Sequence, residues 1–368
     1  GTLRTTGSSH LGRAGDVNLL HQFIVGKDTI LEINGTADGV KLGDALVVEE
    51  GGVAKMLKDD GIQNDTVIRV EKGGAFLASG KADVLGALTG EGTVVMNFVR
   101  LTLPAGKGPF VFGGVMTNAN VGITNPDAAG DDRYILLAST DAFAEVTVTA
   151  PNPTAARRFI RFKPGVGTFK IKSYSQQANE PLHLEDTGGN PVTVQTTFTE
   201  GTTCAVTGSG NVVLTHDNTR NYGGPVFSHT GWLSTAGPGT TYLGTLDAGT
   251  DVDLTDYAGF DIGTGSTLGF KQSVATTVTQ LVTGGGQLYV GNSMTFENLR
   301  MSGDASALTA ANDATVTLKN PAARLKTVSG YNTSDLVVDG GYLSGPTDDR
   351  IVTAFNQTIG STLSVTNC

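Results

Sequence analysis

Three acidic clusters are the residues in this sequence whose types and spacing most readily suggest chemistry. Asp59-Asp60, Asp131-Asp132-Arg133 and Asp348-Asp349-Arg350 offer carboxylates that could bind Ca²⁺, or a general base beside a sugar-binding cation. Each cluster lies close to a Gly or Pro, in an expected turn. Adjacent residues on a strand point to opposite faces, so paired carboxylates share one side only where a loop bends. We therefore predict solvated turns, with Asp131, Asp132, Asp348 and Asp349 as the candidate Ca²⁺ ligands and no other cofactor.

Histidines and catalytic motifs do not define a reaction centre. The histidines are scattered without ligand spacing, at His10, His21, His183, His216 and His229. His216-Asp217 suggests a general base, but the sequence has no G-x-S-x-G elbow, H-E-x-x-H, P-loop or Gly-rich fingerprint in a βαβ setting. Tyr222 and the single Trp, Trp232, either form a modest sugar platform or seal one turn of the fold. We predict no catalytic centre, with a polysaccharide-degrading enzyme as an alternative.

The two cysteines, Cys204 and Cys368, leave their pairing open. They are compatible with one disulfide, within or between chains, and equally with two free thiols. No Cys or His spacing typical of a metal site accompanies them. No run reaches the ~18 apolar residues of a membrane-spanning helix and no signal peptide is visible, so we expect a mature, secreted, soluble product.

The charge balance argues against nucleic acid as a partner. The formal net charge is −10 and the pI is near 4.9, whereas phosphate binding needs a basic face. One basic segment, 157–172, surrounds the turn Pro164–Gly167 and is expected to form a β-hairpin. Its charges either protect an edge strand from unwanted pairing or bind an anionic partner. Its basic residues are Arg157, Arg158, Arg161, Lys163, Lys170 and Lys172.

The elements that must position these residues are strands. Runs rich in Val, Ile, Thr and Phe alternate with Gly, Asn and Asp, which form turns. This pattern predicts an all-β protein. The expected strands include Thr29–Ile33, Ala45–Glu49, Thr66–Glu71, Thr93–Phe98, Arg100–Leu103, Glu145–Thr149 and Val192–Phe198.

A repeat of 20 residues narrows the all-β class to a β-solenoid. Leu268, Leu288, Leu308 and Val328 are spaced by it, and Leu343 and Leu363 form a second pair. One 20-residue turn of a β-solenoid cannot bury its apolar face alone and must stack on its neighbours. We predict that the first four residues form one interior ladder and that Leu343 and Leu363 form an equivalent one. Several of these leucines follow a Gly, which suits a corner of the coil.

Two stretches resemble the autotransporter-associated β-strand repeats of bacterial passenger domains. The first is Ile68–Asn97, which reads RVEKGGAFLASGKADVLGALTGEGTVVMN from Arg69. The second is Gly208–Ser234, where GNVVLT from Gly210 is followed by Asn218-Thr219 and Tyr222-Gly223-Gly224. The matches cover well under half of the chain, and the family's β-barrel translocator is missing. The resemblance implies a right-handed parallel β-helix displayed outside the cell, with no catalytic residues to carry over.

These patterns predict four parts. Residues 1–22 form an N-terminal arm, 23–123 solenoid turns, 124–200 either a small β-rich insertion or irregular turns, and 201–368 further solenoid turns. The arm is small, polar and poor in apolar anchors, so it cannot bury enough surface to hold itself in place. We expect it to add a strand to the open edge of another copy.

The function that this sequence favours is structural. We expect a self-assembling subunit of a surface filament, sheath or layer. An adhesin, or a fibre or decoration protein of a virus particle, would use the same rigid scaffold and could bind a surface glycan.

Overall fold

The computed structural model defines part of the 368-residue chain. The residues described are 1–5, 22–35, 42, 44–64, 66–96, 99–103, 110–117, 120–124, 135–140, 145–148, 160–171, 174–176, 182–197, 206–223, 228–331, 333–345, 352–355 and 363–366. Among them, only the backbone is described at Arg100, 120–124, 145–148, 160, 174–176, 352–355 and 363–366.

The chain divides into two compact units, Gly1–Cys204 and Ala205–Cys368. Every regular element within the described residues is a strand, which confirms the all-β prediction. Among the residues with a described structure, no helix has the length and apolar character needed to cross a membrane.

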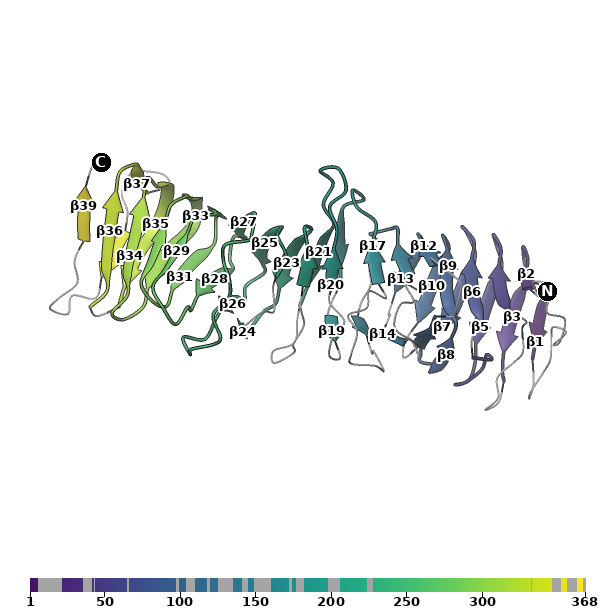
Figure 1. Cartoon of the computed structure of the whole chain (residues 1–368). Coiled ribbons are helices and arrows are strands. Elements are labelled where there is room, and N and C mark those ends of the chain that lie inside the picture. Colours follow the sequence, from purple (N-terminus) through teal and green to yellow (C-terminus); the bar gives the residue numbers. More distant parts are fainter. Residues whose placement is uncertain are drawn as a thin grey trace. The chain divides into compact units, whose positions relative to one another are not determined.

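Unit 1 is built from three parallel sheets, with short strands stacked in the order of the chain (Figure 1). The first sheet contains β1 (Thr2–Arg4), β3 (Ile30–Ile33), β5 (Val53–Met56), β7 (Ala75–Ala78), β10 (Thr93–Met96) and β13 (Val115–Thr117). The second contains β2 (Gln22–Val25), β4 (Ala45–Val48), β6 (Val67–Val70), β9 (Ala87–Gly90), β12 (Phe110–Phe112), β15 (Ile135–Leu137) and β17 (Ile160–Phe162). The third contains β8 (Asp83–Leu85), β11 (Val99–Thr102), β14 (Asn120–Thr124), β16 (Glu145–Val148) and β19 (Tyr174–Gln176). The unit also holds β18 (Thr168–Lys170), β20 (Leu182–Leu184) and β21 (Thr193–Thr196).

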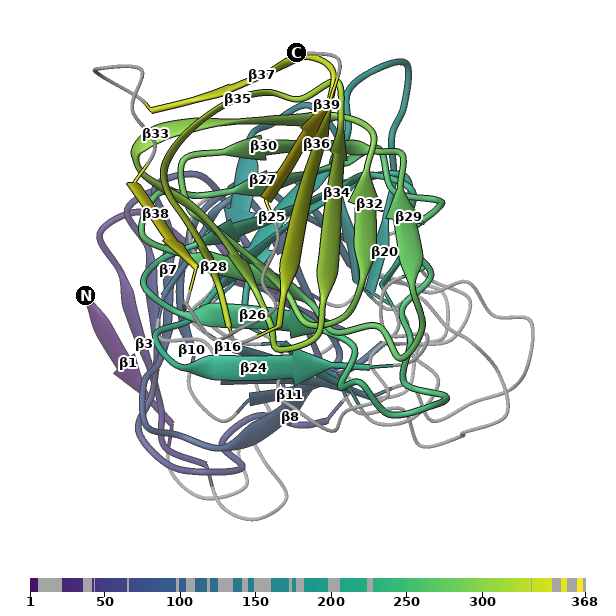
Figure 2. The same ribbon diagram turned by 90° about the vertical axis from the view of Figure 1, so that its left-hand side faces the viewer.

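Unit 2 repeats this plan, and Figure 2 shows its sheets as sides of one coil. One side contains β23 (Asn211–Thr215), β25 (Trp232–Ala236), β27 (Gly259–Ile262), β30 (Leu281–Gly284) and the first part of β33 (Leu299–Ala310). A second side contains β24 (Thr219–Tyr222), β26 (Thr240–Leu243), β28 (Thr267–Phe270), β31 (Gln287–Val290), the end of β33, β35 (Ala322–Gly330), β37 (Tyr342–Ser344) and β38 (Val352–Phe355). The third contains β29 (Thr276–Val278), β32 (Met294–Phe296), β34 (Thr315–Lys319), β36 (Asp335–Asp339) and β39 (Leu363–Thr366). The remaining strand is β22 (Val206–Gly208).

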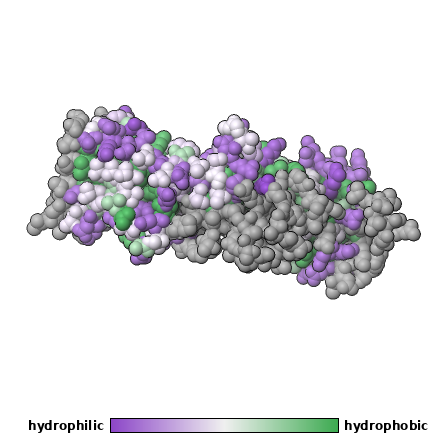
Figure 3. Space-filling view, viewed as in Figure 1, coloured by the Kyte–Doolittle hydropathy of each residue, from purple (hydrophilic) through white to green (hydrophobic). Residues whose placement is uncertain are grey.

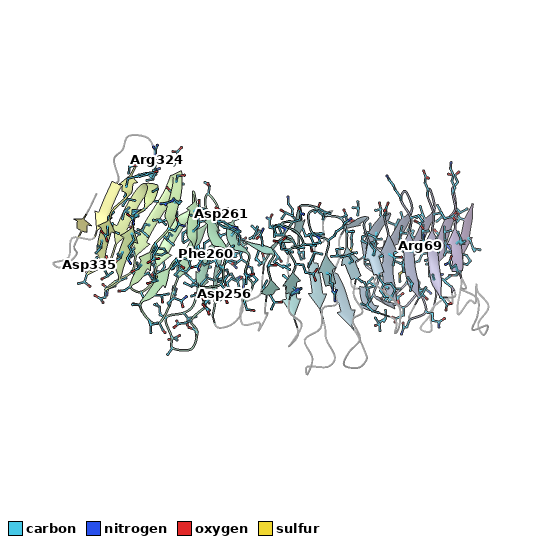
Figure 4. The ribbon with its side chains drawn as sticks, turned by 45° about the horizontal axis from the view of Figure 1, so that its top comes forward. Arg69, Asp256, Phe260, Asp261, Arg324 and Asp335 are labelled. Atoms are coloured by element: carbon cyan, nitrogen blue, oxygen red, sulfur yellow. The ribbon has the colours of Figure 1, made fainter. Side chains whose placement is uncertain are left out.

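The stacking of parallel strands turn on turn makes both units β-solenoids. Because side chains alternate along a strand, one set of each strand points into the coil and the other points out. Phe260, labelled in Figure 4, is fully buried, whereas Arg69 and Arg324 lie exposed on the outside. The narrow interior is filled by Leu, Val, Ile and Phe, as the sequence predicts.

The predicted ladder exists in unit 2. Leu268 faces Leu288, Leu288 faces Leu308 and Leu308 faces Val328 in register, and all four side chains are buried. The second predicted ladder is wrong. Leu343 aligns with Ala323 on β35, whereas Leu363 aligns with Leu336 on β36, so the two residues lie in different sheets.

Glycine is required where the chain turns against the turn before it. Gly73 has φ +82°, a left-handed conformation that side chains rarely adopt. A Cβ on the next residue, Gly74, would lie 2.6 Å from the carbonyl oxygen of Val48 in the preceding turn. Glycine at this corner therefore lets consecutive turns approach to hydrogen-bonding distance.

Where residues 1–22 are described, they form strands of the chain's own sheets. Thr2–Arg4 forms β1, which pairs in parallel with Ile30–Ile33 of the same chain, and the Gly1 carbonyl accepts a hydrogen bond from Ile30 N. Gln22 already belongs to β2. The described start of the chain therefore adds a strand to its own sheet, because that edge offers unpaired main-chain groups.

Most strands described in the segment 124–200 belong to solenoid turns, and Asp186 and Pro191 also form an isolated antiparallel bridge. β14, β15, β16, β17 and β19 all pair in parallel with strands of neighbouring turns. The expected hairpin at 157–172 is also wrong, because β17 and β18 pair with different strands, β15 and β21, both in parallel. The turn Pro164–Gly167 is a corner of the coil.

Candidate binding face

The buried acid Asp83 joins two turns of unit 1. Its carboxylate accepts hydrogen bonds from Ile62 N at 3.0 Å and from its own neighbour Val84 N at 2.6 Å. The side chain is 3% exposed, and burial raises the pKa of Asp83 to about 6, a rise that the nearby Asp60 carboxylate increases. Asp83 therefore serves the backbone of the coil.

The described histidines of unit 2 are also built into the coil. His216 Nδ1 donates to the Asn218 carbonyl at 2.8 Å, so Nε2 accepts from the Thr241 hydroxyl of the next turn at 2.8 Å. This geometry uses both ring nitrogens of His216 to hold the coil together. In unit 1, His183 Nε2 lies 3.8 Å from Glu185 Oε1.

His229 begins a row of aromatic rings through the core of unit 2. Its Nε2 donates to the Trp232 carbonyl at 3.3 Å, and its ring meets Tyr257 edge to face, with centroids 5.1 Å apart. The row continues through Phe260 and Phe270 to Phe296, with centroid separations of 5.0–6.0 Å. Burial lowers the pKa of His229 to about 4, so the ring is neutral at pH 7.

Eight of the candidate residues named from the sequence fall outside the described residues. They are the acids Asp131, Asp132, Asp348 and Asp349, the cysteines Cys204 and Cys368, and the histidines His10 and His21. Asp59 and Asp60 are described and lie exposed in a turn, where Asp59 Oδ1 accepts from Ala82 N at 3.1 Å. Within the described part of the chain, no three His, Cys, Asp or Glu side chains come together as a metal site would require.

The residues that gather on an outer face are tyrosines of unit 2. Tyr242, Gly269 and Tyr289 follow one another in register across β26, β28 and β31. The same outward row continues with Thr309 and Ser329, whose hydroxyl oxygens lie 3.0 Å apart. We call these five residues, together with Lys271 and Tyr331, the tyrosine face.

Two rings of the tyrosine face close over Gly269. Tyr242 and Tyr289 meet edge to face with centroids 5.4 Å apart. A Cβ at Gly269 would lie 2.3 Å from Tyr242 Cδ1 and 3.2 Å from Tyr289 Cδ1, so only glycine leaves room for both rings. Partial burial raises the pKa of both tyrosines, and the neighbouring Tyr331 adds to both rises.

Lys271 and Tyr331 lie at the two ends of a second row, which runs beside the row of Tyr242, Gly269 and Tyr289. Lys271, Gly291, Ala311 and Tyr331 each follow a strand of consecutive turns, and each donates its amide to the turn before. Lys271 Nζ lies 3.6 Å from the centroid of the Tyr242 ring, a cation–π contact, and burial lowers the pKa of Lys271. Tyr331 is 51% exposed. Small residues therefore separate a cation and an exposed ring along the face.

Of the two interpretations of Tyr222 and Trp232, a sugar platform or a sealed turn, Tyr222 fits the second. Tyr222 is buried and in register with Leu243, so it seals the coil. Trp232 lies on another side, with its ring against Gly259. Sequence reasoning missed the tyrosine face, although one signal was available: Tyr242, Gly269 and Tyr289 each follow an inward residue of the repeat.

Figure 3 shows the side of unit 2 that is turned to the viewer as mostly white and purple, with small green areas. No protein-family model, curated protein or solved structure matches this chain.

Proposed function

We propose that this chain is a non-catalytic structural protein that acts outside the cell and associates with copies of itself through an outer face of unit 1. The observation that carries the proposal is the outward side of the sheet that begins with β1. Half of its outward side chains are apolar, and two of these, Ile30 and Val115, are 39% and 37% exposed. The apolar members of this face are Ile30, Val53, Ala75, Leu77, Val95 and Val115.

These residues form two continuous rows. Ile30, Val53 and Ala75 are in register on consecutive strands, and Thr93 and Val115 extend that row. Lys55, Leu77 and Val95 form the parallel row beside it. A flat apolar strip on a stacked sheet is the kind of surface that marks an interaction site.

A second copy is the partner that the charges favour. Arg4, Glu32 and Lys55 are in register at one end of the strip, and Arg4 Nε donates to Glu32 Oε2 at 2.6 Å. Because the signs alternate along the strip, a copy related by a twofold axis can place Lys55 near Glu32 in both directions. Such a self-complementary contact is typical of homo-oligomers.

The bonding of three ionisable groups of the coil supports a structural role. Asp83, His216 and His229 each hydrogen-bond to backbone or hydroxyl groups that hold the coil together. Catalytic acids and bases instead face a substrate. The resemblance to passenger-domain repeats supports a location outside the cell, where a pair of copies joined through this strip would be the repeating unit of a surface filament, sheath or layer.

Sedimentation velocity over a concentration series tests the proposed association. We expect the parent chain to associate, and V95K and I30K to remain single, because each places a charge in the apolar strip. T317K is the matched control, since Thr317 also points outward, on β34 of unit 2, and this variant should associate as the parent does. A parent chain that stays single at every concentration, or V95K and I30K variants that associate normally, would contradict the proposal.

A further inference from the structure

We infer that the tyrosine face of unit 2 binds a neutral carbohydrate chain. The inference goes beyond the proposed structural role, because it concerns the other unit and does not require association. A pyranose ring has an apolar face of C–H groups and a rim of hydroxyls. It therefore needs an aromatic surface with hydroxyl and amide groups beside it, and this is the composition of the face.

The aromatic part is held in place before any ligand arrives. Tyr289 is fixed by its contact with Tyr242, and Tyr242 is fixed from the other side by Lys271. The lysine stem passes over Gly291, because its Cγ lies 3.0 Å from where a Cβ of Gly291 would be, so the absence of a side chain there leaves the stem room. Rings that are already ordered lose little conformational entropy on binding, which favours affinity.

The polar part runs beside the rings. Thr309 and Ser329 continue the row of Tyr289, and a second outward row carries Thr240, Thr267 and Gln287. From Lys271 to Tyr331 the face spans three steps between adjacent strands, or about 14 Å at ~4.8 Å per step. This is the length of a short oligosaccharide, so the face suits a chain better than a single sugar.

An exposed leucine in a strained conformation borders the face. Leu246 has φ +73°, which is unfavourable for a bulky side chain, and is 43% exposed. Its amide donates to the Lys271 carbonyl at 2.9 Å, and its side chain lies beside Gly291. The strain keeps an apolar side chain at the solvent edge of the rings, where a C–H face of a sugar would contact it.

Other partners fit this surface less well. A peptide adding a strand needs an open sheet edge, but the main chains of β26, β28 and β31 are paired within the sheet. A nucleic acid or acidic glycan meets a chain of net charge −10, and Lys271 is already engaged with Tyr242. The hydroxyl-lined rings therefore favour a neutral glycan.

Isothermal titration of the full chain with defined hexasaccharides tests the inference. The probes are neutral hexamers of β-linked glucose, xylose and mannose, with hexagalacturonate as the anionic comparator. We expect at least one neutral hexamer to bind, and hexagalacturonate to bind at least about tenfold more weakly. Y331A and Y289A should each weaken binding about tenfold or more, the equivalent of ~1.4 kcal/mol.

Two further variants separate binding from folding. Y289F keeps the ring and should bind within about twofold of the parent, a difference of ~0.4 kcal/mol. Y342A removes another 51% exposed tyrosine of unit 2 that lies outside the face, and it should bind as the parent does. Absence of binding to all three neutral hexamers, or binding that Y331A and Y289A leave unchanged, overturns the inference. Binding measured on V95K keeps this result independent of association.

Discussion

At the residue scale, two buried titratable groups, Asp83 and His229, give the units opposite responses to pH. Asp83 in unit 1 has its pKa raised from 3.8 to about 6, chiefly by burial. Its stabilising contribution is therefore fully present below pH ~4 and is lost as the pH rises through 6, on the order of 3 kcal/mol. D83N removes this titration, so the parent should lose thermal stability between pH 4 and 7 that D83N does not lose. Circular dichroism melts at several pH values measure this, with D59N as the exposed control. Parallel pH profiles for parent and D83N would refute it.

His229 in unit 2 acts in the opposite direction. Burial depresses its pKa from 6.5 to about 4, so its contribution is present above pH ~6.5 and is lost as the pH falls through 4, again on the order of 3 kcal/mol. H229F keeps an aromatic ring against Tyr257 but cannot be protonated. Fluorescence of Trp232, the single tryptophan, reports this unit. The parent's unfolding midpoint should fall more steeply than that of H229F between pH 6.5 and 4. An equal fall in both proteins would show that the histidine does not titrate in the core.

At the scale of the strand, the interior ladder carries the stability of unit 2. Leu288 is buried between Leu268 and Leu308, so L288A leaves a cavity and should cost on the order of 2–5 kcal/mol. Q287A, on the same strand β31 but pointing outward, should change the free energy of unfolding by less than ~0.5 kcal/mol. Urea unfolding followed by Trp232 fluorescence compares the two. Similar losses in both variants would mean that the ladder is not the core.

The sequence predicted the ladder of unit 2 because turns of constant length place Leu at one inward position every 20 residues. The same spacing failed for Leu343 and Leu363, since β37 and β38 both pair with β35 and the simple repeat ends there. The tyrosine face was missed for a related reason. A longer connection between Tyr242 and Gly269 breaks the period, so their alignment becomes evident only from strand pairing. Composition and the alternation of apolar and polar residues were enough to predict the fold class. The outer rows could not be predicted, because they depend on the register in which the strands pair.

At the scale of the whole molecule, we propose different tasks for two outer faces: the apolar strip of unit 1 would join copies, and the tyrosine face of unit 2 would stay open for a ligand. Both tasks follow from one property of a solenoid: outward residues in register make continuous rows while the interior holds the shape. A scaffold of this kind needs no catalytic centre to be useful at a surface.

Electron cryomicroscopy of the full chain at a concentration where it associates tests the central claim most directly. The account predicts that neighbouring copies meet through Ile30, Val53, Ala75, Leu77, Val95 and Val115, and that Tyr289 and Tyr331 remain exposed to solvent in every copy. Images that show only single copies, or an interface that leaves the apolar strip open and covers the tyrosine face, would contradict it.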